Sequence, residues 1–266
     1  MKCQCLCLAV NLKQIRGVDN YNICTGGGVD VIFRGMAKSY RQFCPVAKAA
    51  EIIAERWTPL VIRELLAGSH RFNDLRRGVP LMSPSLLSQR LKFLEDEGLI
   101  ERRSELDGDA VEYHLSRAGQ ELLPVIESLG TWGKRWVRRE VESDDLDPGL
   151  LMWDIHRRLH IDRFPAKRTV LRFELTGAPS KARFYWLVIE HGKVDICLKD
   201  PGHEVDLYIV SDTETLTSVW LGDIALDRAL HTHAIVLHGP RQLIRQFRSW
   251  LQLSVFADIE RQDAEF

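Results

Sequence analysis

Residues 83–98 constrain the fold of this chain more than any other segment, because they have the pattern of a short, capped amphipathic helix. We expect Ser83 to cap the helix, Pro84 to occupy its first turn and Gly98 to end it. Helical spacing gathers the apolar side chains on one arc, namely Leu86, Leu87, Leu91, Phe93 and Leu94. The opposite arc carries Ser85, Ser88, Gln89, Lys92 and Asp96. Hydroxyl, amide and ammonium groups suit base edges and phosphates in a DNA groove, although an ordinary core helix with a solvated serine-rich face has the same pattern.

The segments around this helix favour the DNA-binding interpretation. Upstream, Thr58-Pro59 opens a helix that Gly68 closes, and residues 71–78 are long enough for two further helical turns. Two helices, a tight connection and a capped third helix form the helix-turn-helix arrangement, in which the last helix enters the major groove.

Downstream, residues 99–104 and 110–115 alternate as two strands around an Asp107-Gly108 turn, which predicts a hairpin, or wing. Ser116 then caps a helix predicted to run through Glu140. Pro124 lies inside that helix and should kink or split it.

Several motifs in residues 40–138 resemble the HxlR family of bacterial winged-helix regulators, which are related to the MarR group. The motifs are Cys44-Pro45-Val46, Arg56-Trp57-Thr58, Ile62-Arg63-Glu64-Leu65-Leu66, Arg71-Phe72-Asn73-Asp74-Leu75, residues 83–91, Leu94-Glu95, Glu97-Gly98-Leu99-Ile100 and Tyr113-His114-Leu115-Ser116. The resemblance implies a homodimeric transcription regulator of double-stranded DNA, with dimer contacts through the first and last helices of the domain. A palindromic operator and a repressor role are the corresponding expectations.

The outer arc of the predicted recognition helix supplies the candidate DNA contacts. Gln89 and Ser85 are the candidates for base contacts, and Ser88 and Lys92 for phosphate contacts, with plain solvation as the alternative. Arg90 lies within the apolar arc, so either it pairs with an acidic residue such as Asp74 or it reaches a phosphate. The other candidates are Arg71, Asn73, Ser83, Arg102 and Arg103.

Charge gives the chain no global basic field, since 36 Lys and Arg residues face 37 Asp and Glu residues. Residues 36–140 carry 17 basic against 15 acidic side chains, and residues 141–266 carry 15 against 20. Attraction to DNA would therefore depend on local patches and should be sensitive to salt.

Residues 148–266 have the pattern of an α+β unit with one sheet covered on one face by helices. The segments Tyr185-Trp186-Leu187-Val188-Ile189, Asp206-Leu207-Tyr208-Ile209-Val210-Ser211-Asp212 and Leu237-His238-Gly239-Pro240 look similar to the sterol-carrier-protein-like domain. The resemblance implies a fold able to enclose an apolar small molecule. The candidate lining is Phe173, Trp186, Leu207, Trp220 and Phe247. A solid core and a dimerisation module without ligand are the alternatives.

The predicted organisation is an extension over residues 1–35, a winged helix over 36–142 and the sterol-carrier-like domain over 148–266. Cys44 directly precedes a helix that begins at Pro45, a position where cysteines can be reactive, so it is a candidate thiol sensor. The alternative is an ordinary thiol without such a role. No catalytic constellation and no metal-ligand spacing stand out, which predicts a protein that is not an enzyme and holds no cofactor. No apolar run is long enough to span a bilayer, so we expect no membrane contact and a cytoplasmic location.

These patterns support two functional hypotheses. The leading one is a dimeric DNA-binding transcription regulator, controlled by an apolar small molecule in its C-terminal domain. The alternative is a small-molecule carrier whose winged helix serves as a dimer or interaction module.

Overall fold

The computed structural model describes residues 39–104, 111–137 and 145–262 and divides the chain into two compact units, residues 1–51 and 52–266. The predicted extension over residues 1–35 and the Asp107-Gly108 turn lie outside the described residues. In the first unit, the Glu51 carboxylate accepts hydrogen bonds from the Ser39 hydroxyl and the Tyr40 amide, both at 2.9 Å. Helix α1 (Pro45–Ile53) starts in this unit, directly after Cys44 as predicted.

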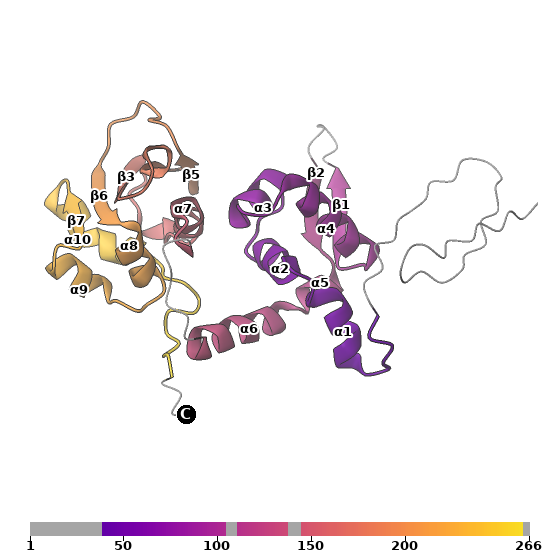
Figure 1. Ribbon diagram of the computed structural model, residues 1–266. Coiled ribbons are helices and arrows are strands. Elements are labelled where there is room, and N and C mark those ends of the chain that lie inside the picture. The colour runs from indigo at the N-terminus through magenta and orange to yellow at the C-terminus, as the bar shows by residue number, and fades with distance from the viewer. Residues whose placement is uncertain (1–38, 105–110, 138–144, 263–266) are drawn as a thin grey trace, which may run out of the picture. The chain divides into compact units, whose positions relative to one another are not determined.

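The first part of the second unit is a winged helix (Figure 1). Three helices pack around one apolar core, and a two-stranded antiparallel hairpin follows them. The core is built from residues such as Val61, Leu75, Leu87, Leu91 and Leu94, all of them fully buried or nearly so. The elements are α2 (Thr58–Leu66), α3 (Phe72–Gly78), α4 (Pro84–Asp96), β1 (Ile100–Ser104) and β2 (Val111–Leu115).

Pro124 splits the helix predicted after the wing, because its ring cannot continue a helix and its missing N–H is tolerated only in a first turn. The Ser116 hydroxyl accepts a hydrogen bond from the Gly119 amide at 3.2 Å and caps α5 (Arg117–Gln120). Helix α6 (Leu123–Trp136) then starts with Pro124 in its first turn. It ends at Trp136 rather than at Glu140, since Val137 is already extended.

The second part of the unit is a five-stranded sheet with the strand order β5-β4-β3-β6-β7. All neighbouring strands are antiparallel except β3 and β6, which are parallel with Phe173 opposite Ile209. The strands are β3 (Thr169–Thr176), β4 (Phe184–Glu190), β5 (Lys193–Cys197), β6 (Leu207–Asp212) and β7 (Ile235–His238). His191 and Gly192 both have positive φ angles, which allow a tight turn between β4 and β5.

Helices cover one face of this sheet, as predicted (Figure 1). Side chains of all four helices join the inward side chains of the strands in a single apolar core. Asp212 caps α8 by accepting a hydrogen bond from the Thr215 amide at 2.7 Å. The helices are α7 (Pro148–His156), α8 (Thr213–Trp220), α9 (Leu226–His231) and α10 (Arg241–Trp250). No helix within the described part of the chain is both long and apolar enough to cross a bilayer.

Trp186, one of the five residues predicted to line a cavity in this core, lies on the other face of the sheet. In a strand, successive side chains point to opposite faces, so Tyr185 and Leu187 join the main core while Trp186 faces away from the helices. There Trp186 packs with Val170 and Val188, and the Arg172 guanidinium lies 5.8 Å from its ring centre. β4 is buried on both faces, which hid this alternation in the sequence.

The other four predicted lining residues pack in the solid part of the core. Phe173, Leu207 and Phe247 are almost wholly buried, and Trp220 is only slightly exposed. They belong to one contiguous cluster, and none of them lines either of the two cavities described below. The packing therefore favours the solid-core alternative over an apolar cavity within the sheet domain.

Candidate nucleic-acid interface

Helix α4 has the two faces that the sequence predicts. Its cap is formed by Ser83, whose hydroxyl accepts a hydrogen bond from the Leu86 amide at 3.3 Å, and Gly98 adopts a positive φ just past its end. Leu87, Leu91 and Leu94 are buried in the winged-helix core. The polar face is exposed, with Ser85, Ser88, Gln89, Lys92 and Asp96 all open to solvent.

Most of the polar side chains on this face have partners within the helix or its cap. The Ser85 hydroxyl lies 3.2 Å from that of Ser83, and the Ser88 hydroxyl donates to the Pro84 carbonyl at 3.0 Å. Lys92 is 2.9 Å from Asp96 and 3.4 Å from Glu95, and the Asp96 hydrogen bond is the main reason why the pKa of Lys92 is raised. Exposed pairs of this kind are worth little, so Lys92 is able to exchange them for a phosphate.

Arg90 pairs with an acidic residue, as one of its two predicted roles requires, but the partner is Glu55 rather than Asp74. The Arg90 guanidinium lies 3.5 Å from the Glu55 carboxylate and 5.6 Å from the centre of the Phe93 ring. Asp74 instead lies 3.5 Å from Arg77, one turn away on the same helix. The sequence spacing could not distinguish these partners because Glu55 precedes the whole helix-turn-helix segment.

Arg71 connects the start of α3 to the wing. Its Nε donates to the Glu112 carboxylate at 3.3 Å, and Arg71 and Glu112 also form an isolated β-bridge. Glu112 accepts a second bond from His114 Nε2 at 2.9 Å, which is the largest cause of its lowered pKa. Arg71 therefore has a structural role beside its predicted one.

The two arginines of the wing, Arg102 and Arg103, are both exposed on β1. As consecutive residues of a strand they point to opposite faces of the hairpin, so a single groove or phosphate row can meet only one of them directly. Arg103 lies 2.9 Å from Glu101. Asn73 is exposed as well, but it lines a cavity together with Trp153 and Tyr185 of the sheet domain.

One functional feature was missed by the sequence interpretation: the Glu64 carboxylate of α2 is fully buried where the winged helix meets α7. Two guanidinium nitrogens of Arg157 donate hydrogen bonds to it at 2.8 and 3.2 Å, and a guanidinium nitrogen of Arg63 donates another at 2.8 Å. Trp153 Nε1 and the Ser69 hydroxyl each donate to it at 3.3 Å. Burial raises the pKa of Glu64, but the two guanidinium groups lower it more, so the carboxylate is held ionised.

Glu64 could have been suspected from its position, because it follows Val61 by three residues and so lies on the buried side of α2. Its partner Arg157 lies 93 residues further along the chain and gives no local signal. Gly78 packs directly against the carboxyl group, and an added Cβ there would overlap it.

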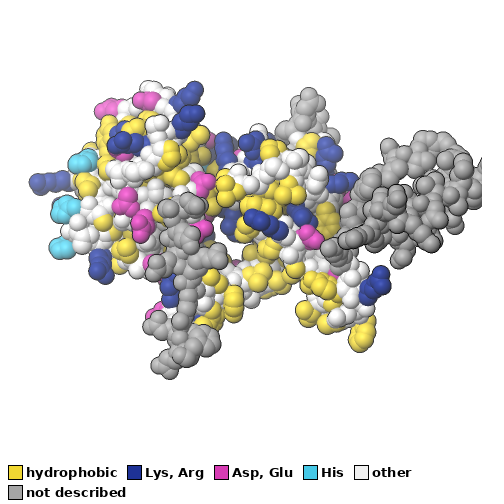
Figure 2. Space-filling model, in the orientation of Figure 1, with side chains coloured by type: hydrophobic (Ala, Val, Ile, Leu, Met, Phe, Trp, Pro, Cys, Tyr) yellow, Lys and Arg dark blue, Asp and Glu magenta, His cyan; other side chains and the backbone are white. Residues whose placement is uncertain are grey.

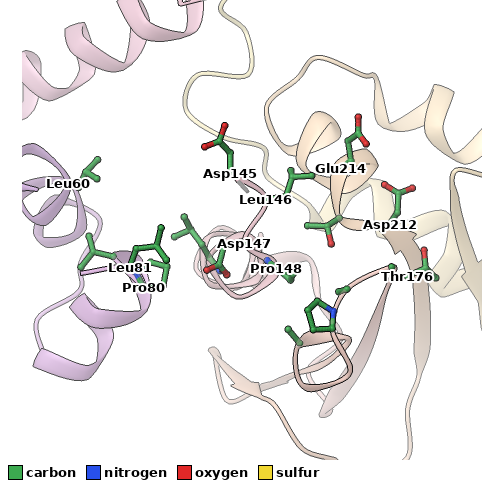
Figure 3. A pocket seen from close by; sticks show the side chains of 18 of the residues that line it. Leu60, Pro80, Leu81, Asp145, Leu146, Asp147, Pro148, Thr176, Asp212 and Glu214 are labelled. Carbon is green, nitrogen blue, oxygen red and sulfur yellow. The ribbon is translucent and has the colours of Figure 1, made fainter. Parts of the chain in front are cut away.

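Two cavities lie beside this junction. The larger, of about 790 Å³, is lined by apolar residues such as Leu60 and Leu81 and by the carboxylates of Asp145, Asp147 and Glu214 (Figure 3). The smaller, of about 450 Å³, lies between α3, α7 and the β4–β5 hairpin. Among the residues that the structure describes, no three His, Cys, Asp or Glu side chains are placed to hold a metal ion.

Comparison with known proteins identifies the family of the winged-helix region. Residues 52–141 match the family model described as HxlR-like helix-turn-helix. The uncharacterized HTH-type transcriptional regulator YvaP of Bacillus subtilis is 35% identical over 98 residues, which are 36% of this chain and 91% of that protein. The chain belongs to the HxlR-like helix-turn-helix family. The resemblance inferred from the motifs of residues 40–138 is thereby confirmed from residue 52 onward.

Other similar proteins cover the same region. The uncharacterized HTH-type transcriptional regulator Rv3095 of Mycobacterium tuberculosis is 38% identical over 95 residues, 35% of this chain and 60% of that protein. The crystal structure of a putative transcriptional regulator of the MarR family from Porphyromonas gingivalis is 33% identical, covers 35% of this chain and 91% of that chain, and has a TM-score of 0.32. These matches cover little more than a third of the chain, and they leave the sterol-carrier resemblance of the sheet domain unconfirmed.

Proposed function

We propose that this protein is a dimeric, sequence-specific DNA-binding transcription regulator that acts as a repressor and responds to a small molecule. The observation that carries the proposal is the exposed polar face of α4, which is supported from behind by three buried leucines in an HxlR-like helix-turn-helix. Its relatives are named HTH-type transcriptional regulators. In a helix-turn-helix, this helix enters the major groove and its first turns contact the base edges.

Within this proposal, Ser85 and Gln89 read bases, since both are exposed in the first two turns of α4. Ser88, Lys92 and one of the two exposed arginines of the wing meet phosphates, which position the protein without reading sequence. Arg90 holds α4 through Glu55 rather than contacting DNA. Cys44 is a candidate thiol sensor at the start of α1, where its side chain is half-buried and not engaged in a disulfide.

The dimer is supported by an apolar stripe along α6 (Figure 2). Val125, Leu129, Trp132 and Trp136 follow the spacing i, i+4, i+7 and i+11, which places them on one side of the helix. All four are exposed, Trp132 to 61%. A stripe of this length would remain in contact with water in a monomer, and a second copy of α6 would bury it.

Selection of binding sites from random duplex DNA tests the proposal directly. A regulator enriches a palindromic sequence with half-sites about one helical turn apart. The alternative, a carrier whose winged helix is an interaction module, enriches no sequence but still binds small molecules. No enrichment from a folded, dimeric sample would contradict the proposed function.

Two substitutions on α4 distinguish a residue that contacts bases from a residue that contacts phosphates. Gln89→Ala should lower affinity for the selected site by about 1–3 kcal/mol and leave random DNA almost unaffected. Lys92→Ala should weaken binding to all sequences and reduce the slope of affinity against salt by about one charge. Equal losses on selected and random DNA for Gln89→Ala would reject its reading role.

A further inference from the structure

The smaller cavity has the size and walls of a ligand site. Its volume of about 450 Å³ lies within the range of about 300–1,000 Å³ that is typical of small-molecule pockets. Side chains of Trp153, Leu150, Ile196 and Leu198 give it apolar walls. Leu198 is 64% exposed, which is a high value for a leucine and leaves a large apolar surface at the mouth.

Besides Asn73 and Asp147, the polar side chains in the lining of this cavity are donors. Tyr185 is only 2% exposed, and among the residues that the structure describes no group forms a hydrogen bond with its hydroxyl, although the residue lines the cavity. Burial raises the pKa of Tyr185 to about 12, so the hydroxyl keeps its proton at neutral pH. Arg76 and Arg77 reach the cavity from α3, and Arg77 lies 5.1 Å from the centre of the Trp153 ring.

The one carboxylate in the lining of the cavity already accepts a hydrogen bond. Asp147 is the acidic residue in its lining, and the Asp147 carboxylate accepts a hydrogen bond from the Leu150 amide at 3.0 Å as the cap of α7. Two guanidinium groups, of which that of Arg77 also lies 3.5 Å from Asp74, and a phenol hydroxyl therefore face a carboxylate that is already engaged. An anionic group of a ligand would complete this arrangement, because the Tyr185 hydroxyl opens into the cavity and is able to donate a hydrogen bond there.

The larger cavity lacks a comparable set of donors for an anionic ligand. Asp147 and Asp212 in its lining cap helices α7 and α8. Its single guanidinium, that of Arg63, is held by Glu64 and by the Gly78 carbonyl at 2.9 Å. Asp147, Asp212 and Arg63 are thus used within the fold, and the other charged groups of the lining, Asp145 and Glu214, are carboxylates that would repel an anion (Figure 3).

We propose that the smaller cavity binds an amphipathic organic anion, a carboxylate on a medium-length hydrocarbon chain. The carboxylate lies between the guanidinium groups of Arg76 and Arg77 and the Tyr185 hydroxyl, and the chain lies along Leu150 and Leu198. The inference rests on the proposed function, because it names the chemical class of the regulating small molecule. The site also differs from the one predicted from the sequence, since it lies outside the sheet core.

This position gives a physical route to regulation. Arg76 and Arg77 belong to α3, which is followed by α4 after a short connection, whereas Trp153 and Tyr185 belong to the sheet domain. A ligand that binds both sides favours the arrangement in which they lie close together. It can shift DNA binding only by its difference in affinity for the two arrangements, which sets the size of the effect.

Isothermal titration calorimetry of the full chain with octanoate and with 1-octanol tests this inference without DNA. The two probes have chains of the same length and differ in charge, so the proposal expects octanoate to bind at least tenfold more tightly. Tyr185→Phe removes one hydroxyl and keeps the ring, and it should weaken octanoate about tenfold without changing 1-octanol. The double variant R76A/R77A should abolish octanoate binding, whereas Arg228→Ala, at an exposed arginine outside the cavity lining, should have no effect.

Equal affinity for the two probes, or octanoate binding that survives in both the Tyr185→Phe and the R76A/R77A variants, would overturn the proposal. Circular dichroism of each variant establishes that it has folded before its titration is interpreted. Failure of this inference is distinguishable from failure of the proposed function, because site selection on unliganded protein tests DNA recognition alone. A chain that enriches an operator but does not discriminate octanoate from 1-octanol would keep its regulator role and lose this site.

Discussion

Glu64 and Trp132 are opposite exceptions to the ordinary partition of side chains between core and surface. Glu64 is a charged side chain that is completely buried, and Trp132 is a large apolar one that is 61% exposed. Glu64 finds all its partners within the chain: two guanidinium groups, an indole N–H and a hydroxyl. Trp132 belongs to a stripe that the described part of the chain leaves open to water. The buried charge therefore serves the fold, whereas the exposed apolar stripe requires a partner to cover it.

Removing the buried charge should give the largest effect. Glu64→Ala leaves Arg63 and Arg157 without their common counter-charge, and breaking a buried pair costs about 3–5 kcal/mol. Urea unfolding followed by circular dichroism measures this loss. The matched control is Glu214→Ala, at an exposed carboxylate, which should change the free energy of unfolding by less than about 0.5 kcal/mol. A loss below about 1 kcal/mol for Glu64→Ala would show that Glu64 does not hold the junction.

Placing a charge in the exposed stripe should act on assembly rather than on folding. Trp132→Glu should weaken the dimer by about 2 kcal/mol or more, roughly a 30-fold rise in its dissociation constant, because aromatic residues at the centre of an interface carry much of its energy. Sedimentation equilibrium measures the constant. Glu127→Ala changes an exposed residue of the same helix off the stripe and should leave assembly intact. An unchanged dimer in Trp132→Glu would remove α6 from the interface.

A third test asks whether the region around Glu64 responds to pH. His156 is half-buried at the end of α7, and burial lowers its pKa to about 4 from an ordinary value of 6.5. Between about pH 6.5 and 4, His156 is therefore protonated in the unfolded chain but neutral in the folded chain. The free energy of unfolding consequently falls as the pH drops through that range. His156→Gln should remove about 1–2 kcal/mol of this fall at pH 5. Parallel curves of stability against pH for the two proteins would contradict the assignment.

The smallest expected effect separates two serines on α4. Ser83 caps the helix, so Ser83→Ala should lower the free energy of unfolding by about 1 kcal/mol, as measured by thermal unfolding. Ser85 lies two residues further on and makes no cap, so Ser85→Ala should weaken DNA binding at nearly constant stability. The reverse result would move the DNA contact from Ser85 to Ser83.

The sequence predicted those features that are encoded locally. The cap at Ser83, the helix end at Gly98 and the split at Pro124 all follow from short patterns of residues. Features that depend on distant partners were missed, namely the Glu64–Arg157 junction and the pairing of Arg90 with Glu55. The facing of Trp186 was missed for another reason, since a strand buried on both sides has no polar alternation to reveal its orientation.

The candidate sites also differ in whether they are encoded locally or depend on distant residues. The exposed polar face of α4 could be predicted, because helical spacing alone separates Gln89 from the leucines behind it. The cavity beside Tyr185 could not, because its lining combines α3 with strands more than a hundred residues away. Periodicity locates a surface on one element, whereas a concave site depends on how elements meet.

The contact between Gly78 and the Glu64 carboxyl group has a consequence for the history of the chain. A methyl group at position 78 would occupy the space of a carboxyl group that four neighbours hold in place, so neither position can change alone without penalty. The two sites should therefore mutate in concert. Descendants that acquire a side chain at position 78 should carry a smaller residue at position 64, and with it a neutral replacement for Arg157.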